Sequence, residues 1–108
     1  MNQALLETLR TAQRFGFFGE RSIEDAAQHS IDYVRALDQI ELPARLLDLG
    51  SGGGLPGLVI ADALPGMSIV LLDRRQKRTD FLERAVTKLG LRDVAVRCAD
   101  VAEVIDEV

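Results

Sequence analysis

Asp48-Leu-Gly-Ser-Gly-Gly-Gly-Leu-Pro-Gly57 is the stretch of sequence that decides the fold. It follows the short apolar run Ala44-Arg-Leu-Leu47 and leads into the helical pattern of residues 58–64. A strand, a glycine-rich turn and a helix in this order are typical of a nucleotide-binding βα unit. Glycines let the backbone adopt positive φ and approach a ligand closely. The stretch therefore predicts an α/β fold with a ligand at the turn.

The rest of the chain predicts helices that alternate with strands. Apolar residues recur at helical spacing in the first third of the chain, and short apolar runs recur after it. Right-handed crossovers between parallel strands then give the sheet order 3-2-1. The predicted fold is a Rossmann-like half of a doubly wound α/β fold, with helices on both faces of the sheet and two N-terminal helices before it. The expected helices cover residues 2–14, 22–42, 55–64, 75–89 and 101–108, and the expected strands cover residues 44–49, 68–72 and 94–98.

Length and composition limit the class of protein. A chain of 108 residues, 47% hydrophobic and 28% charged, is expected to fold as a single domain. We divide it into a helical segment, residues 1–42, and a βαβαβ unit, residues 43–108. The net charge of −4 argues against binding nucleic acid by bulk charge alone. Neither a signal peptide nor an apolar run that could span a bilayer is present, so we expect a cytoplasmic protein that does not bind membranes.

The single cysteine, Cys98, excludes a disulfide within the chain and suits a reducing compartment. It falls in an apolar strand pattern, so we expect its side chain in the core rather than as a reactive thiol. No cluster of cysteine and histidine has the spacing of a zinc site, and no metal is expected.

Two cofactors compete for the glycine-rich turn. Gly52, Gly54 and Gly57 satisfy the dinucleotide pattern, and Asp73 follows at a suitable distance. The spacing of Asp48, Gly50 and Gly52 instead suits S-adenosylmethionine. This cofactor carries a sulfonium and an ammonium group, which a carboxylate attracts, whereas a carboxylate is a poor neighbour for a pyrophosphate. Asp48 therefore favours S-adenosylmethionine, while a dinucleotide site and a purely structural turn remain as alternatives.

Two further carboxylates end the next strands. Asp73 ends the second strand, where a carboxylate accepts hydrogen bonds from the two ribose hydroxyls of either cofactor. Its structural alternative is a cap for the next helix. Asp100 follows the third strand and could accept from an adenine amino group, with the Val101 amide donating to the ring. Its alternative is the N-cap of the helix that starts at Val101.

These motifs resemble a known family. Residues 48–57 resemble the first motif of class I methyltransferases, and the ending Gly54-Leu-Pro-Gly57 resembles that of the glucose-inhibited division protein B family, the 16S ribosomal RNA guanine-N7 methyltransferases. Residues 71–82 resemble that family's second motif. Arg14-Phe15 and His29-Ser-Ile-Asp32 are more loosely similar to its N-terminal helices.

The resemblance implies methyl transfer from S-adenosylmethionine to guanine N7 of small-subunit ribosomal RNA. Guanine N7 carries a free lone pair, so the reaction needs alignment rather than a general base, and the sequence leaves the catalytic residue unassigned. The predicted cofactor-binding residues are Asp48, Gly50, Ser51, Gly52, Gly54, Leu55, Asp73, Arg74, Asp100 and Val101.

The predicted RNA contacts are His29, Lys77 and Arg78. The last two belong to the densest basic run of the chain, residues 74–78. A solvated helix N-terminus is the alternative and carries at least equal weight, although cations there oppose the helix dipole, which adds some support to a function. For His29 the alternative is an ordinary surface histidine. The rings of residues 15, 17 and 18 could stack on bases, but we expect them to pack in the core.

Two other functions remain open: a non-catalytic module that binds S-adenosylmethionine or serves in assembly, and part of an NAD-dependent oxidoreductase. The first strand would lie at a sheet edge in this chain, with Leu46–Leu49 exposed. An apolar edge strand is a template for pairing with another chain, so we expect self-association there.

Overall fold

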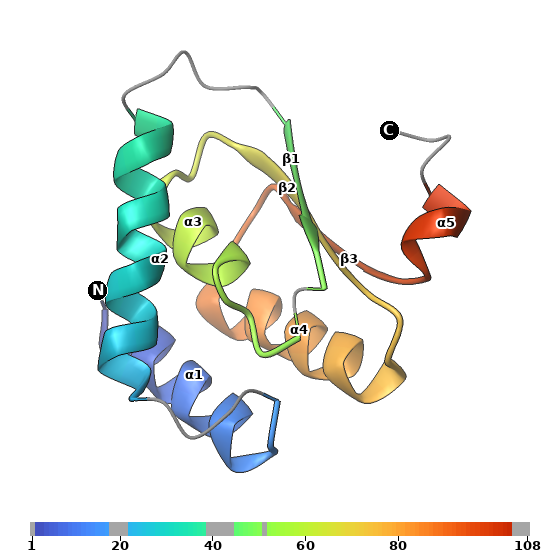
Figure 1. The fold of residues 1–108 in the computed structure, drawn as a ribbon, viewed down its shortest axis with the longest axis horizontal. Coiled ribbons are helices and arrows are strands. Elements are labelled where there is room, and N and C mark those ends of the chain that lie inside the picture. Colours follow the sequence, from blue (N-terminus) through green and yellow to red (C-terminus); the bar gives the residue numbers. More distant parts are fainter. Residues whose placement is uncertain (1, 18–21, 39–44, 51, 105–108) are drawn as a thin grey trace.

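The computed structural model describes residues 2–17, 22–38, 45–50 and 52–104. The helices and strands follow one another as α1 (Gln3–Arg14), α2 (Ile23–Asp38), β1 (Arg45–Leu49), α3 (Gly57–Ala63), β2 (Ser68–Asp73), α4 (Gln76–Leu89), β3 (Val94–Cys98) and α5 (Val101–Val104) (Figure 1). Over these residues, no helix is long and apolar enough to cross a membrane.

The three strands form one parallel sheet in the order β1-β2-β3, which confirms the predicted topology. In its register Leu47 lies opposite Val70, and Val70 lies opposite Ala95. Because the strands are parallel, their carboxyl ends share one edge of the sheet. The glycine-rich turn, Asp73 and Asp100 therefore meet at that edge, although they are far apart in the sequence.

The helix ends follow from local chemistry. α1 begins after Asn2, whose side-chain oxygen accepts the N–H of Leu5 at 2.7 Å. The amide nitrogen of the same side chain donates to Asp62 of α3 at 2.9 Å, so the cap also joins two helices. α4 ends at Gly90, whose φ of 66° forms a left-handed C-cap as predicted. α3 begins two residues later than predicted, because residues 52–56 form a turn.

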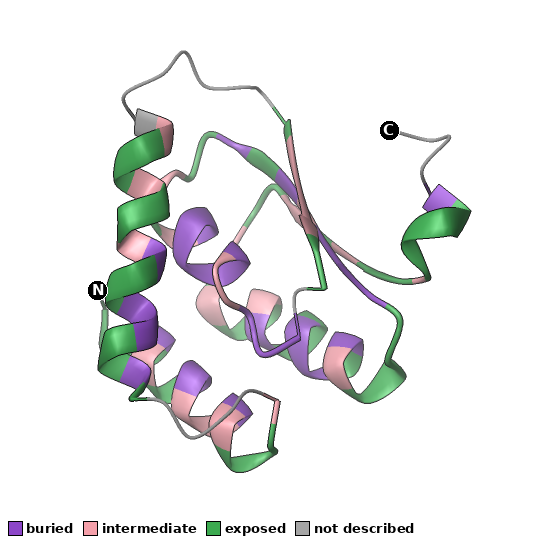
Figure 2. Cartoon of the chain, in the orientation of Figure 1, coloured by how far each residue is buried: buried purple, intermediate pink, exposed green. Residues whose placement is uncertain are grey.

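The hydrophobic core lies on one face of the sheet. Figure 2 shows buried positions gathered where α3 and α4 face β2 and where α1 and α2 pack on these two helices. Ile69 and Leu71 of β2 point to these helices, whereas Val70 and Leu72 point to the other face. Of the helices that the structure describes, only the single turn of α5 lies on that second face, where Val104 is buried. Helices thus lie on both faces, as predicted, but four of them share one face.

This one-sided packing corrects three expectations. Cys98 is exposed rather than in the core, because it ends the edge strand β3, of which only Val94 and Val96 pack on the helices. β1 is half-buried rather than buried, because helices cover one of its faces only. Phe15 is 58% exposed, although its ring contacts Phe17 and Phe81.

Leu71→Ala should destabilise the chain far more than the same change at Leu49. The Leu71 side chain is fully buried, whereas Leu49 is 55% exposed. Truncation of a buried leucine leaves a cavity and costs about 2–5 kcal/mol, whereas truncation at an exposed site costs roughly 0.5 kcal/mol. Urea denaturation measures both free energies of unfolding. Equal losses would contradict the assignment of the core to the α1–α4 face.

Candidate functional site

A hollow of about 360 Å³ lies at the carboxyl edge of the sheet, between the turn after β1 and the start of α5. Hollows of this size hold small ligands and cofactors. Predicted cofactor-binding residues form much of its wall: Gly50, Asp73, Arg74, Asp100 and Val101. The rest of the wall consists of Leu49, Leu72, Arg75 and Ala99.

Asp73 is the most constrained group of this hollow. Its side chain is only 1% exposed. The backbone N–H groups of Gly52 and Arg75 donate to its two carboxylate oxygens, at 3.0 and 2.9 Å. The guanidinium of Arg75 donates to the same two oxygens through Nε and Nη2, each at 2.9 Å. The carboxylate is therefore held in place and fully hydrogen-bonded.

These contacts keep Asp73 charged. The Arg75 side chain, which donates directly to the carboxylate, lowers the pKa of Asp73 to about 2. Burial acts in the opposite direction, and the backbone donors of Arg75 and Gly52 add to the lowering. An ionised carboxylate is an acceptor on both oxygens, which is the state needed to bind a pair of hydroxyls.

Arg75 was missed by the sequence analysis, which chose Arg74. Arg74 is exposed and lines the hollow, but the residue that bonds to Asp73 is Arg75. The spacing of Asp73 and Arg75 in the sequence could have identified this contact. A residue two positions after a strand-ending aspartate can donate both its N–H and its side chain back to that carboxylate, as in an Asx-turn.

The glycine-rich turn is fastened to β2. The N–H of Gly50 donates to the carbonyl of Leu72 at 2.8 Å, and the N–H of Gly52 reaches Asp73. Gly54 has a φ of 99°, and a Cβ there would overlap the Leu58 side chain of α3. The turn is thus shaped by contacts on both sides. Ser51, also predicted to bind the cofactor, lies outside the described residues, and Leu55 is half-buried in the turn, away from the wall of the hollow.

Asp48 holds the far end of the turn. Its Oδ2 accepts the N–H of Gly57 at 3.0 Å. A Cβ at Gly57 would overlap both this oxygen and Leu71, so glycine permits the approach. Asp48 is not among the residues that line the hollow. In this structure it ties the first turn of α3 to β1, and its contact with a positively charged ligand stays a prediction.

Asp100 caps α5 as predicted and also lines the hollow, while its contact with an adenine stays a prediction. Its Oδ1 accepts the N–H of Ala102 at 3.0 Å, which caps α5. It also lines the hollow beside Val101. The cap and the place at the hollow are compatible, because a carboxylate has a second oxygen.

The predicted RNA contacts lie in different surroundings. Arg78 is half-buried: its Nη1 donates to the carbonyl of Phe17 at 2.7 Å, and its guanidinium lies 4.9 Å from the centre of that ring. Lys77 is exposed on the first turn of α4. His29 is exposed on α2, edge-on to Tyr33 with ring centres 5.7 Å apart. None of the three lines the hollow.

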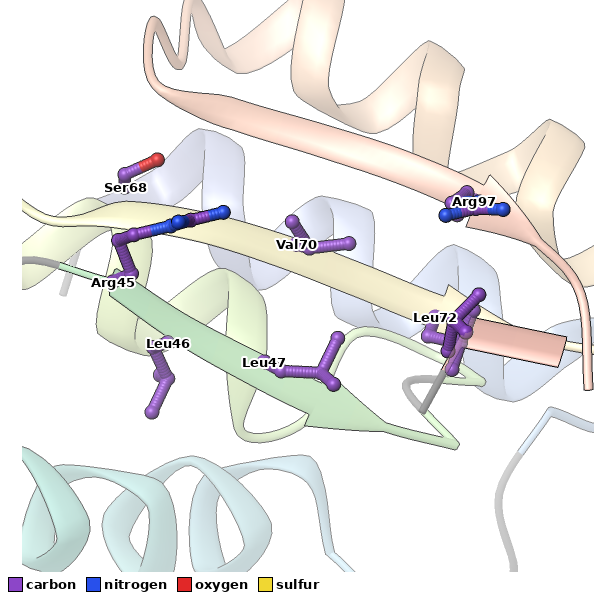
Figure 3. Close-up of a pocket in the computed structure, with 8 residues that line it drawn as sticks. Arg45, Leu46, Leu47, Ser68, Val70, Leu72 and Arg97 are labelled. Atoms are coloured by element: carbon purple, nitrogen blue, oxygen red, sulfur yellow. The ribbon is translucent and has the colours of Figure 1, made fainter. Parts of the chain in front are cut away.

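A second hollow, of about 330 Å³, lies on the open face of the sheet (Figure 3). Its floor is apolar and includes Leu47, Val70 and Leu72, with Arg45 and Arg97 at the strand margins. It includes no residue of the glycine-rich turn. Over the described part of the chain, no group of three acidic, cysteine or histidine side chains could hold a metal ion. The hollow at the carboxyl edge is therefore the candidate site.

Comparison with known proteins places most of the chain within one family. Residues 2–107 match the family described as GidB, rRNA small subunit methyltransferase G. A protein named ribosomal RNA small subunit methyltransferase G 2 from Syntrophobacter fumaroxidans is 46% identical over 66 residues, which are 61% of this chain and 13% of that protein. The ribosomal RNA small subunit methyltransferase G of Neisseria meningitidis is 44% identical over 78 residues, 72% of this chain and 38% of that protein.

Solved structures share the fold at lower identity. A putative O-methyltransferase from Klebsiella pneumoniae superposes with a TM-score of 0.76 at 17% identity, over the whole of this chain and 48% of that one. Coclaurine N-methyltransferase bound to N-methylheliamine and SAH superposes with a TM-score of 0.63 at 23% identity, over 79% of this chain and 25% of that one.

The matched region spans well under half the length of these curated relatives. The family match, in contrast, covers residues 2–107, which is nearly all of this chain. The chain belongs to the rRNA small subunit methyltransferase G family.

Proposed function

We propose that this chain is the cofactor-binding portion of an S-adenosylmethionine-dependent methyltransferase that acts on guanine N7 of small-subunit ribosomal RNA. The observation that carries the proposal is the buried, ionised carboxylate of Asp73, fixed at the end of β2 inside a hollow of cofactor size. Membership of the family supports two parts of the proposal: the transfer of a methyl group, and small-subunit ribosomal RNA as its acceptor.

The residues of the hollow fit an adenine nucleoside. Asp73 would accept the two ribose hydroxyls, which is the usual role of an acidic residue at this point of the fold. Asp100 would accept from the adenine amino group, and the Val101 amide would donate to the ring. Leu49 and Ala99 supply apolar wall around them. Gly50 leaves the backbone of the turn open to the ligand, since no atom would meet a Cβ there.

The chemistry demands little from protein side chains. When bound, S-adenosylmethionine supplies a methyl group on a positively charged sulfur. Guanine N7 has an in-plane lone pair and no proton to lose, so the protein has to align the acceptor and exclude water rather than provide a base. This agrees with a site that has a fixed carboxylate and, among its described lining residues, no serine, threonine, cysteine, lysine or histidine.

In the proposed function, the helical segment 1–42 and the unit 43–108 both contact the RNA. Lys77, at the exposed start of α4, would contact a phosphate of the RNA. His29, on α2, would face the RNA. Arg78 is predicted to contact RNA directly. Because it contacts both the carbonyl and the ring of Phe17, it is better suited to positioning that residue. We place the protein in the cytoplasm, where ribosomal RNA is modified.

A second proposal concerns self-association. Within the described residues, β1 pairs with β2 on one side and with no strand on the other. Its Leu47 and the neighbouring Val70 form part of an apolar face that is only half-covered. We propose that two copies of the 108-residue chain pair through β1 by two-fold extension of the sheet.

The chain should bind S-adenosylhomocysteine and should not bind NAD at comparable concentrations, as measured by calorimetry. Asp73→Asn should weaken the first affinity by about tenfold or more, because one acceptor oxygen becomes a donor. Asp80→Asn makes the same change on the exposed side of α4 and is the control. Thermal denaturation checks that both variants are folded. Tighter binding of NAD would favour the oxidoreductase alternative.

Lys77→Ala should weaken binding to a small-subunit RNA fragment and reduce the salt dependence of that binding by about one counterion. Lys88→Ala, at the other end of α4, should leave both quantities unchanged, since its side chain is far from the carboxyl edge. Formation of 7-methylguanine from labelled cofactor would separate an enzyme from a module that only binds cofactor. If the two lysine variants behave alike, α4 does not present its first turn to RNA.

Light scattering should show a dimer of the 108-residue chain, and Leu47→Lys should convert it into a monomer. A lysine on an edge strand opposes pairing between sheets. Ala95→Lys, an exposed position on the opposite edge strand β3, should leave the dimer intact. A monomeric wild-type chain at high protein concentration would refute the association.

A further inference from the structure

The Asp73 carboxylate has no acceptor capacity left. Two carboxylate oxygens offer about four lone-pair sites. In this structure four donors use them: the N–H groups of Gly52 and Arg75, and Nε and Nη2 of the Arg75 side chain. The ribose hydroxyls assigned to Asp73 in the proposed function therefore require two of these donors to leave.

The two backbone donors are fixed in place. Gly52 belongs to the turn that Gly50 fastens to β2. The Arg75 N–H sits at the N-cap of α4, whose next residues are already in the helix. Removing either donor would mean unfolding part of the turn or of the helix end.

The Arg75 side chain, in contrast, can leave. This side chain is 51% exposed, so water can hydrate the guanidinium when its hydrogen bonds to the carboxylate break. An ion pair with one partner this exposed contributes little net free energy, because solvent competes for the cation. Asp73 would stay ionised, since its two backbone donors remain.

We propose that Arg75 occupies the ribose subsite of the ligand-free chain and competes with the nucleoside for Asp73. Its Nε and Nη2 donate side by side, as two adjacent hydroxyls would. Arg75 is thus a positioning residue: in the ligand-free chain it holds the carboxylate in the binding geometry, and it lowers the affinity for any ligand whose ribose displaces it. The inference rests on the proposed function and adds an affinity-limiting residue to it.

The occupied and displaced states can be distinguished by NMR on the wild-type chain. The Nε–H signal of Arg75 should shift toward that of a free arginine as adenosine saturates the site. 2′,3′-Dideoxyadenosine, which lacks both hydroxyls, should leave the signal in place when it binds. An unchanged signal at saturation with adenosine would overturn the inference while leaving the nucleoside site intact.

Substitution supplies an independent readout. Arg75→Ala should bind adenosine about two- to fivefold more tightly than the wild type, the range that a half-exposed ion pair allows. Arg84→Ala, which removes an exposed arginine of α4 that does not line the hollow, should bind adenosine as the wild type does. Unchanged or weaker binding by a folded Arg75→Ala chain would overturn the inference. If neither the wild type nor Arg75→Ala binds adenosine, the proposed site itself is wrong, and the inference is overturned with it.

Discussion

The hydrogen bonding of Asp73 is the interaction on which the rest of the site depends. Its carboxylate takes one donor from the turn after β1 and three from Arg75 at the start of α4. Its backbone carbonyl accepts the N–H of Ala99, just after β3, at 3.1 Å. One residue therefore joins the ends of all three strands. A neutral residue here would leave buried donors without an acceptor, which costs more than a single hydrogen bond contributes.

The one-sided core explains why the site lies at the edge of the sheet. On one face, α3 and α4 pack against β2, which contributes Ile69 and Leu71, and α1 and α2 pack on these two helices. The carboxyl ends of the strands stay uncovered and line the hollow. The turn after β1 lies against α3 through Gly54 and Gly57, where any side chain would overlap a neighbour. Packing on the helical face thus sets the shape of the turn, while its other side stays open to the hollow.

The sequence was sufficient to predict the strand order, the helices and the residues at the strand ends, because these follow from periodicity and from parallel topology. It did not predict burial at the sheet margins. Cys98 has an apolar pattern around it, but the pattern cannot tell a central strand from an edge strand, and β3 is an edge. Asp48 was assigned by its charge, whereas its contact with Gly57 depends on how the turn folds back on β1. Arg75 was overlooked because its bond to Asp73 depends on a local turn and a side-chain rotamer.

The basic run at the start of α4 can now be divided by what its members contact. Cations are unfavourable at a helix N-terminus, yet Arg75 and Arg78 stand there one turn apart. Each has a partner within the chain that offsets this cost: Asp73 for Arg75, and the carbonyl and ring of Phe17 for Arg78. The arginines thereby connect α4 to the end of β2 on one side and to the segment after α1 on the other. Arg74 and Lys77 are exposed instead, so the charges of these two members of the run face the solvent.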